Sequence, residues 1–582
     1  MQHSKNDISQ LDEQAHALWA RMWSSLSPES KLLAWTDWAS HLATSPGKRL
    51  ELTRLALLLA AQMHIYLRQY FASAPLQAEE NGSAAPLPAQ GDPRFQDARW
   101  KQWPFNVWHQ SFLMAQDWWG HATHGVWGVD RHHQASVAFG ARQWLDVFSP
   151  SNWLVSNPVV LERTQQEQGA NLMRGLTFFL EDVQRQLMGK PPVGADAFVV
   201  GRDVAVTPGK VVLRNRVMEL IQYQPTTEKV HPEPILIVPA WIMKYYILDL
   251  SAHNSLIKYL VDQGHTVFCI SWKNPGTAER DLGMDDYLQQ GFFAALEAVN
   301  AIVPERKVHA TGYCLGGTLL AIACAAMARD GDDRLASMSL FTAQTDFSEP
   351  GELCLYIDES QLAMLEAQMA QTGYLSGHQM SGAFQMLRSN DLLWSRLLNE
   401  YLLGERRPMN DLMAWNADVT RMPERMHSQY LRQLFLNDSL SEGHYRVGDR
   451  PVALLDIGTP IFSVATLTDH VAPWRSVHKL HYLTQTEIHF VLTSGGHNAG
   501  IVSEPGRPRR RYQSLTRSAG GKYVSPDEWL QAAPQHEGSW WPEWVSWLQA
   551  RSGEPAHPPR MGAASRGFKA LCDAPGEYVM EK

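Results

Sequence analysis

The stretch that decides the fold of this chain is KVHATGYCLGGTLLAIACAAM, residues 307–327. Its first residues suit a β-strand and its last residues suit a helix. Between them, GYCLG (residues 312–316) fits the G-x-nucleophile-x-G turn, in which small residues let a strand reverse sharply into a helix. The turn presents the thiol of Cys314 at the sheet edge and the backbone N–H of Leu315 as half of an oxyanion hole. A chance glycine pattern around a buried structural cysteine is the alternative for so short a motif.

The partners of a catalytic triad follow in the chain order nucleophile, acid, histidine. Asp469 comes just after the strand-like run Ile461–Ala465, and His497 comes just after Glu487–Leu492. The carboxyl ends of strands are where open α/β sheets build their sites. Taken alone, the aspartate could be a helix N-cap and the histidine a loop residue. His470 is a competing base, to which we assign a supporting role because it adjoins Asp469.

Alternating strand and helix signals from residue 198 onward predict an open, mostly parallel sheet with helices on both faces. The expected strands include 204–206, 211–213, 235–238 and 266–270, with a helix over 285–299. The strand signal vanishes between about 342 and 443, so we expect a helical insertion that caps the site. The predicted architecture is an α/β-hydrolase fold preceded by a mainly helical N-terminal domain. The predicted boundaries are 1–71 (helical segment), 72–93 (flexible linker), 94–197 (helical domain) and 198–582 (catalytic domain).

Composition excludes several classes of protein. The 582 residues carry a formal net charge of −9, which argues against a nucleic-acid partner because phosphate binding needs a basic face. Five scattered cysteines without a C-x-x-C pair argue against a disulfide scaffold and a zinc site. The polar N-terminus does not resemble a secretory signal, so we expect a cytoplasmic protein. The 22 tryptophans allow two readings, ordinary core or a surface that docks on an amphipathic body.

We predict no transmembrane anchor, no metal and no cofactor. The uncharged run Ala310–Ala328 opens with three glycines in eight residues, which fits a turn and a buried helix better than a span. The apolar run Leu55–Leu67 is too short and contains polar residues. The histidines at positions 121, 124, 132 and 133 lack the carboxylate or cysteine spacing that would complete a metal site.

A cysteine nucleophile favours acyl transfer. A neighbouring imidazole can convert the thiol to a thiolate, which attacks acyl groups readily. Exchange of a thioester onto Cys314 is nearly isoenergetic, and a hydroxyl can then take the acyl group in a downhill step. This chemistry favours transfer from a CoA-like thioester over simple ester hydrolysis.

The motifs resemble those of polyhydroxyalkanoate synthases of the single-polypeptide type. The similarity runs from about Asp92 to at least Gly506. The matching segments are Gly312–Thr318, Asp469–Trp474, Gly496-His497, Asn390–Trp394, Asn399–Gly404, Trp415–Thr420, Ser149–Trp153, Asn157-Pro158 and Gly201–Thr207.

The resemblance implies polymerisation of (R)-3-hydroxyacyl-CoA into polyester with release of CoA. Cys314 would carry the acyl chain and His497 would deprotonate the thiol. Asp469 would orient His497, and activation of the 3-hydroxyl of the incoming unit is an alternative or additional role for it. The backbone N–H of Ile242 would supply the second oxyanion donor. The resemblance also implies a homodimer on the surface of cytoplasmic polyester granules. The Trp-rich N-terminal part would then contact that amphipathic surface.

Two segments depart from the family pattern. PAWIMK (239–244) differs from the usual P-P-W-I-N-K, and SGGHNAG (494–500) differs from S-G-H-I-A-G by an inserted glycine and by Asn498 in place of isoleucine. These departures indicate a divergent branch or a second paralogue. The alternatives are a cysteine-nucleophile thioesterase or esterase of the same fold and a non-catalytic granule-associated paralogue.

A basic run follows His497. It contains Arg507, Arg509, Arg510 and Arg511. The run is either a solvated loop or an attractor for the CoA phosphates.

Overall fold

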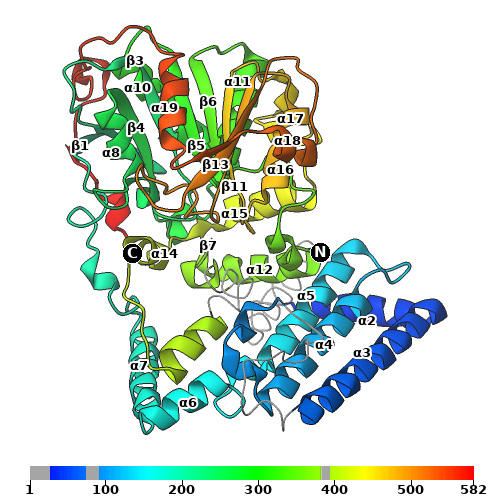
Figure 1. The fold of residues 1–582 in the computed structure, drawn as a ribbon. Coiled ribbons are helices and arrows are strands. Elements are labelled where there is room, and N and C mark those ends of the chain that lie inside the picture. The colour runs from blue at the N-terminus through cyan, green and yellow to red at the C-terminus, as the bar shows by residue number, and fades with distance from the viewer. Residues whose placement is uncertain (1–26, 74–90, 381, 383–392) are drawn as a thin grey trace, which may run out of the picture. The chain divides into compact units, whose positions relative to one another are not determined.

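The computed structural model describes residues 27–73, 91–380, 382 and 393–582 (Figure 1). Most of the predicted linker, and residues 1–26, lie outside the described residues. The chain forms two compact units: a sheet unit from Pro191–Ser381 and Met409–Lys582, and a helical unit from Leu26–Lys190 and Gly382–Pro408.

The sheet unit is built on an eleven-stranded sheet, which confirms the predicted α/β class. Six central strands run parallel, with antiparallel strands added at both edges. The strands in spatial order are β14 (Gln535–Glu537), β13 (Arg511–Arg517), β12 (Ile488–Thr493), β11 (Ile461–Thr466), β6 (Leu335–Phe341), β5 (Val308–Tyr313), β3 (His231–Val238), β4 (His265–Trp272), β2 (Met218–Tyr223), β1 (Gly209–Arg214) and β15 (Cys572–Asp573).

Helices bury the central strands. Strands β4, β5 and β11 are buried along their whole length, as expected where helices cover a parallel sheet. The helices in contact with these strands or their neighbours include α8 (Leu256–Asp262), α10 (Ala294–Ile302), α11 (Leu315–Asp330) and α16 (Trp474–His478). Helix α19 (Trp541–Gln549) covers β6, where the indole N–H of Trp544 donates to Ser339 Oγ at 2.9 Å. The C-terminal tryptophans are therefore core residues.

The strand predictions hold at β1, β3, β4, β5, β11 and β12, and one predicted strand is absent. Strands β2, β6, β13, β14 and β15 were not predicted. Residues 204–206 form no strand: Val204 makes only an isolated bridge with Val200, and Ala205 has a left-handed φ of 54°. The left-handed conformation of Ala205 is incompatible with an extended strand, so the chain turns there.

The region predicted as a cap is divided between the two units. In the sheet unit it contains a short β-ladder, β7 (Tyr374–Leu375) with β8 (Met422–Pro423), among helices. The helices are α12 (Glu359–Thr372), α14 (Asp411–Ala417), α15 (Glu424–Tyr430) and the π-helix η11 (Leu431–Leu436). Residues 382–408 of the same region belong to the helical unit.

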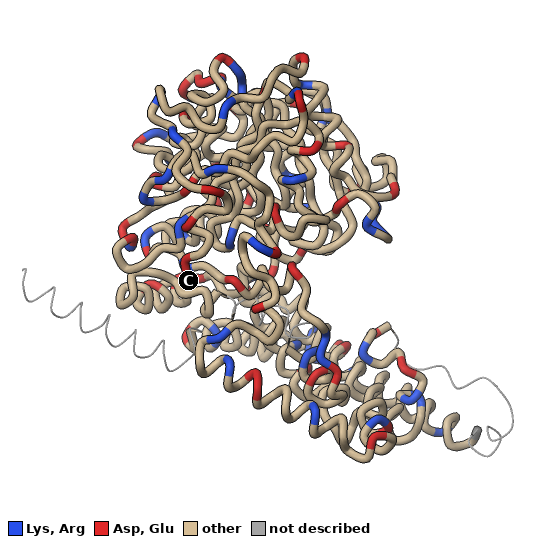
Figure 2. The backbone as a smooth tube through the Cα atoms, turned by 90° about the vertical axis from the view of Figure 1, so that its left-hand side faces the viewer, with Lys and Arg blue, Asp and Glu red and all other residues tan. Residues whose placement is uncertain are grey.

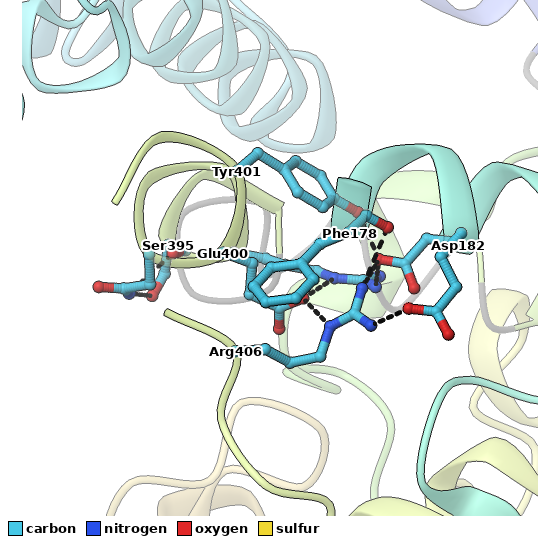
Figure 3. A network of polar contacts seen from close by, with 9 residues as sticks. Phe178, Asp182, Ser395, Glu400, Tyr401 and Arg406 are labelled. Carbon is cyan, nitrogen blue, oxygen red and sulfur yellow. Dashed lines mark hydrogen bonds and ion pairs between the residues drawn. The ribbon is translucent and has the colours of Figure 1, made fainter. Parts of the chain in front are cut away.

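The helical unit joins N-terminal helices to this part of the insertion. Its helices are α2 (Pro28–Ala43), α3 (Pro46–Ser73), α4 (Phe105–Thr123), α5 (Arg131–Val147), α6 (Pro158–Gln166), α7 (Ala170–Leu187) and the π-helix η10 (Leu397–Leu402). Helix η10 packs on α7. Figure 3 shows the polar network that joins them: Arg406 pairs with Glu181 and Asp182 at 2.8 Å each, and the Tyr401 hydroxyl donates to Asp182 at 3.0 Å.

Helix α3 is longer than the apolar run that the sequence suggested. It spans 28 residues and, by length and composition alone, is the one helix among the described residues that could cross a membrane. A single such helix is weak support for a span. Its first three turns carry Lys48, Arg49, Glu51 and Arg54, and its side is contacted by α2 and α4.

Exposed aromatic side chains concentrate in the helical unit. Trp103, Trp108, Trp127, Trp144 and Trp153 are all exposed, and Trp127 is 88% accessible. Charged residues of both signs are interspersed along the two units (Figure 2). The tryptophans of the sheet unit are therefore core residues, whereas those of the helical unit range from the buried Trp100 to the exposed Trp127.

Five histidines are buried in the sheet unit with depressed pKa values. Burial lowers the pKa of His265, His427 and His481 to about 3, and the pKa of His309 and His478 to about 4. Among the described residues, neither ring nitrogen of His265 or His478 has a hydrogen-bond partner. These rings are therefore held neutral in apolar surroundings.

We predict that the fold loses stability as the pH falls from 7 to 5. The unfolded histidines take up protons below about pH 6.5 while the folded ones stay neutral, which costs about 2 kcal/mol per histidine at pH 5. The midpoint of thermal unfolding should therefore drop steadily over this range, and His478→Phe should flatten the dependence. A midpoint that does not change between pH 7 and pH 5 would contradict this account.

Candidate active site

The strand-to-helix turn at Cys314 has the predicted geometry. Cys314 lies between β5 and α11 with φ 53° and ψ −125°, a strained backbone for a residue with a side chain. Its backbone N–H donates to Phe341 O at 2.8 Å. A Cβ atom on Gly316 would lie 2.1 Å from Val238 O, so only glycine lets the start of α11 approach the end of β3.

The acid and the histidine meet as predicted. His497 Nδ1 lies 2.8 Å from Asp469 Oδ2, and both side chains are largely buried. The backbone N–H groups of Val471 and Ala472 each donate to Asp469 Oδ1 at 2.9 Å, and Thr466 Oγ1 donates to Oδ2 at 3.0 Å. The carboxylate is therefore fixed in position before it meets the imidazole.

Electrostatics shift the pKa values of Asp469 and His497 in opposite directions. Burial raises the pKa of Asp469, but the His497 charge and the hydrogen bonds it accepts outweigh burial and leave the pKa below its ordinary value. Burial lowers the pKa of His497, but the charge of Asp469, its hydrogen bond to the ring and the nearby Cys314 side chain raise the pKa well above its ordinary value. Asp469 is therefore hydrogen-bonded to His497, and His497 interacts electrostatically with Cys314.

The other predicted site residues lie on segments next to these three residues. Leu315 is the first residue of α11, where backbone N–H groups have no partner within the helix. Ile242 follows β3, whose last residue pairs with Gly312. The backbone carbonyl of His470 accepts a hydrogen bond from Glu352 N at 3.3 Å.

The altered segment 239–244 is held at its end by distant residues. Trp415 Nε1 donates to Lys244 O at 2.8 Å, and Lys244 Nζ donates to Glu581 O at 2.6 Å. Met243, which stands where the family pattern has asparagine, forms a β-bridge with Val419. The segment that follows β3 is thus fixed by the insertion and by the last residues of the chain.

Sequence reasoning missed two polar contacts beside the triad. The Tyr313 hydroxyl donates to Asn498 Oδ1 at 2.5 Å, so the asparagine that departs from the family pattern has a buried partner. The guanidinium of Arg510 donates to Ser494 O at 3.1 Å and to Ala499 O at 2.5 Å. The adjacency of Tyr313 to Cys314 was a usable signal for the first contact. Nothing in the sequence of the basic run indicated that Arg510 contacts the backbone carbonyls of Ser494 and Ala499.

The remaining four cysteines differ from Cys314 in environment. All five thiols are free. Burial raises the pKa of Cys269, Cys324, Cys354 and Cys572, which lowers their thiolate fraction at neutral pH. Over the part of the chain that the structure describes, no group of three or more His, Cys, Asp or Glu side chains could hold a metal ion.

The chain is placed in the α/β-hydrolase class by a thiol, an imidazole and a carboxylate that follow β5, β12 and β11, three of the six parallel central strands of a mixed sheet. Residues 233–504 match the family described as alpha/beta hydrolase fold. Residues 91–260 match "Poly-beta-hydroxybutyrate polymerase (PhaC) N-terminus", and residues 7–48 match "Poly-beta-hydroxybutyrate polymerase N terminal".

Whole-chain relatives narrow the class to one family. The chain is 42% identical over 502 residues to the poly(3-hydroxyalkanoate) polymerase of Methylorubrum extorquens, covering 85% of this chain and 82% of that one. It is 38% identical to the PhaC polymerase subunit of Rhizobium etli (87% and 80% covered) and 36% identical to that of Cupriavidus necator (78% and 77% covered). The chain belongs to the poly(3-hydroxyalkanoate) polymerase family and is an enzyme of that family.

Proposed function

We propose that this enzyme polymerises (R)-3-hydroxyacyl-CoA thioesters and releases CoA through a covalent acyl-Cys314 intermediate. The observation that carries the proposal is the hydrogen bond of Asp469 to His497, whose imidazole interacts electrostatically with Cys314 at the strand-to-helix turn. The family membership supplies the class of polymer. No cofactor is needed, because the groups of the chain and the activated substrate suffice for the reaction.

The first half-reaction loads the cysteine. Because His497 Nδ1 faces Asp469, Nε2 takes the proton of the Cys314 thiol. The thiolate attacks the thioester carbonyl carbon, and the backbone N–H groups of Leu315 and Ile242 stabilise the oxyanion. The C–S bond to CoA then breaks, and the CoA thiolate takes the proton from His497.

The second half-reaction extends the chain. The 3-hydroxyl of an acyl unit gives its proton to His497 and attacks the acyl-Cys314 carbonyl, which forms an oxygen ester and restores the thiol. Asp469 stabilises the imidazolium formed in each half-reaction. His470 has a supporting role in orienting the loop that carries Asp469.

The polymer product implies a partner surface. We propose that the enzyme is a cytoplasmic homodimer that associates with polyester granules, and the exposed tryptophans of the helical unit support contact with an amphipathic surface. The exposed residues Arg509 and Arg511 are proposed to attract the CoA phosphates.

The proposal is tested by product analysis with (R)-3-hydroxybutyryl-CoA and a medium-chain homologue. Purified enzyme should release CoA and form polymer, and the two rates rank the substrates by chain length. Free hydroxyacid would indicate a thioesterase. Granule binding without CoA release would indicate a non-catalytic paralogue.

We predict that reversing both exposed charges, Arg509→Glu with Arg511→Glu, raises KM for CoA substrates about fivefold, equivalent to about 1 kcal/mol of binding. The increase should shrink at high salt, because exposed charges are screened. Lys229→Glu is the control, since Lys229 is exposed at the opposite end of the sheet, before β3. A KM that does not change, or one that rises equally in the control, argues against phosphate attraction.

A further inference from the structure

The loop that carries His497 is spanned by a single guanidinium. Arg510 lies just before β13, the antiparallel neighbour of β12. One terminal nitrogen donates to Ser494 O before His497, and the other donates to Ala499 O after it. The two hydrogen bonds join the two ends of the segment 494–499, which contains His497.

The extra glycine of this loop fits against the same guanidinium. Gly495 has a φ of 108°, and a Cβ atom there would lie 2.7 Å from Arg510 Nη1 and 3.2 Å from Gly500 N. A side chain would therefore be strained and would push the guanidinium off the loop. Gly495 O also accepts from Thr468 N at 3.0 Å, which ties the loop to the residue before Asp469.

Arg510 makes no ion pair with a carboxylate of the described chain. It is partly buried, and burial together with Arg507 lowers its pKa. Removing a guanidinium from water costs free energy, and hydrogen bonds to backbone carbonyls without a carboxylate partner offset only part of that cost. This cost is consistent with a positional role and is not expected of a solvated basic loop.

We propose that Arg510 is a positioning residue that holds the His497 imidazole against the Cys314 thiol by clamping both sides of the inserted-glycine loop. The inference rests on the proposed function, in which His497 takes the thiol proton. Without the clamp, the loop relaxes and the imidazole moves away from the sulfur. The thiolate fraction of Cys314 then falls.

Arg517 provides a matched control. It lies at the other end of β13 and donates to the backbone carbonyls of His481, Thr484 and Thr486, also without a carboxylate partner among the described residues. It therefore has the same kind of environment as Arg510, but it clamps the loop before β12 and not the loop after it. Loss of either clamp destabilises the sheet unit, whereas only Arg510 acts on His497.

The test is the rate of Cys314 alkylation by iodoacetamide between pH 6 and 9, read by peptide mass spectrometry on the full chain. Arg510→Gln should slow labelling at pH 7 by about tenfold to a hundredfold, as displacements near 1 Å do for reacting groups. Arg510→Lys, which keeps the charge but reaches one carbonyl at a time, should restore part of the rate. Arg517→Gln should label within about twofold of wild type at a matched loss of thermal stability.

The outcomes separate this inference from the proposed function, because alkylation needs no CoA substrate. If wild-type Cys314 is labelled fast and Arg510→Gln is labelled at the same rate, the proposed role of Arg510 is wrong. It is also wrong if Arg517→Gln slows labelling as much as Arg510→Gln does, or if Arg510→Lys restores the full wild-type rate. Wild-type Cys314 that labels no faster than the other four thiols would overturn both, since there would be no activated thiol to position.

Discussion

Replacing Cys314 with alanine is expected to abolish CoA release, with a loss of at least about 10⁴-fold. The Cys314 thiol is the nucleophile that interacts with the His497 imidazole, and the oxyanion donors cannot act without an attacking atom. The rate of CoA release with (R)-3-hydroxybutyryl-CoA, measured on folded protein, checks this expectation.

Two further variants sharpen the test. Cys314→Ser keeps a nucleophile of similar shape but with a far higher pKa, so it should retain a small fraction of the activity. Cys324→Ala is the control, because this cysteine lies within α11, the helix that follows Cys314, and is buried with a raised pKa. If Cys314→Ala still released CoA at a tenth of the wild-type rate, the nucleophile would be another group.

Replacing Asp469 with asparagine is expected to lower kcat by about 10²- to 10⁴-fold. The amide keeps the shape of the side chain but removes the charge that raises the pKa of His497. Two backbone N–H groups already donate to Oδ1, so the amide nitrogen would face His497 Nδ1 and favour the wrong tautomer. The rate should fall with little change in KM.

The matched control is Asp249→Asn. This buried carboxylate accepts hydrogen bonds from Thr207 and Ser255 and lies away from the triad. It should lose stability without the loss in kcat. Equal losses of kcat in the two variants would show that Asp469 acts through the fold and not through His497.

The site was largely predictable because its motifs are local. A nucleophile turn needs small residues at fixed offsets, and the acid and histidine each follow a strand, so one sequence places all three at one sheet edge. Strand β2 was missed for a physical reason. Glu219 is fully buried in it, and its charge is compensated by Arg214 at 2.6 Å and by backbone N–H groups of Glu577 and Tyr578 at the far end of the chain.

The division of the insertion between the two units could not be predicted either, because it depends on partners that are distant in sequence. Residues 393–406 join the helical unit through pairs such as Arg406 with Asp182 and Arg396 with Asp182, which are more than 200 residues apart in sequence. No local pattern signals such partners. Likewise, the contacts of Arg510 are with backbone carbonyls, which every residue carries, so its sequence context resembled a solvated basic loop.

The most direct test of the central claim is to find the acyl group on the enzyme. Acid quenching during turnover with (R)-3-hydroxybutyryl-CoA, followed by peptide mass spectrometry, should show a 3-hydroxybutyryl or oligomeric adduct on the peptide that contains Cys314. The adduct should be absent from Cys314→Ala and should lengthen with time in wild type. CoA release and polymer formation with no acyl group on this peptide at any time would contradict the account.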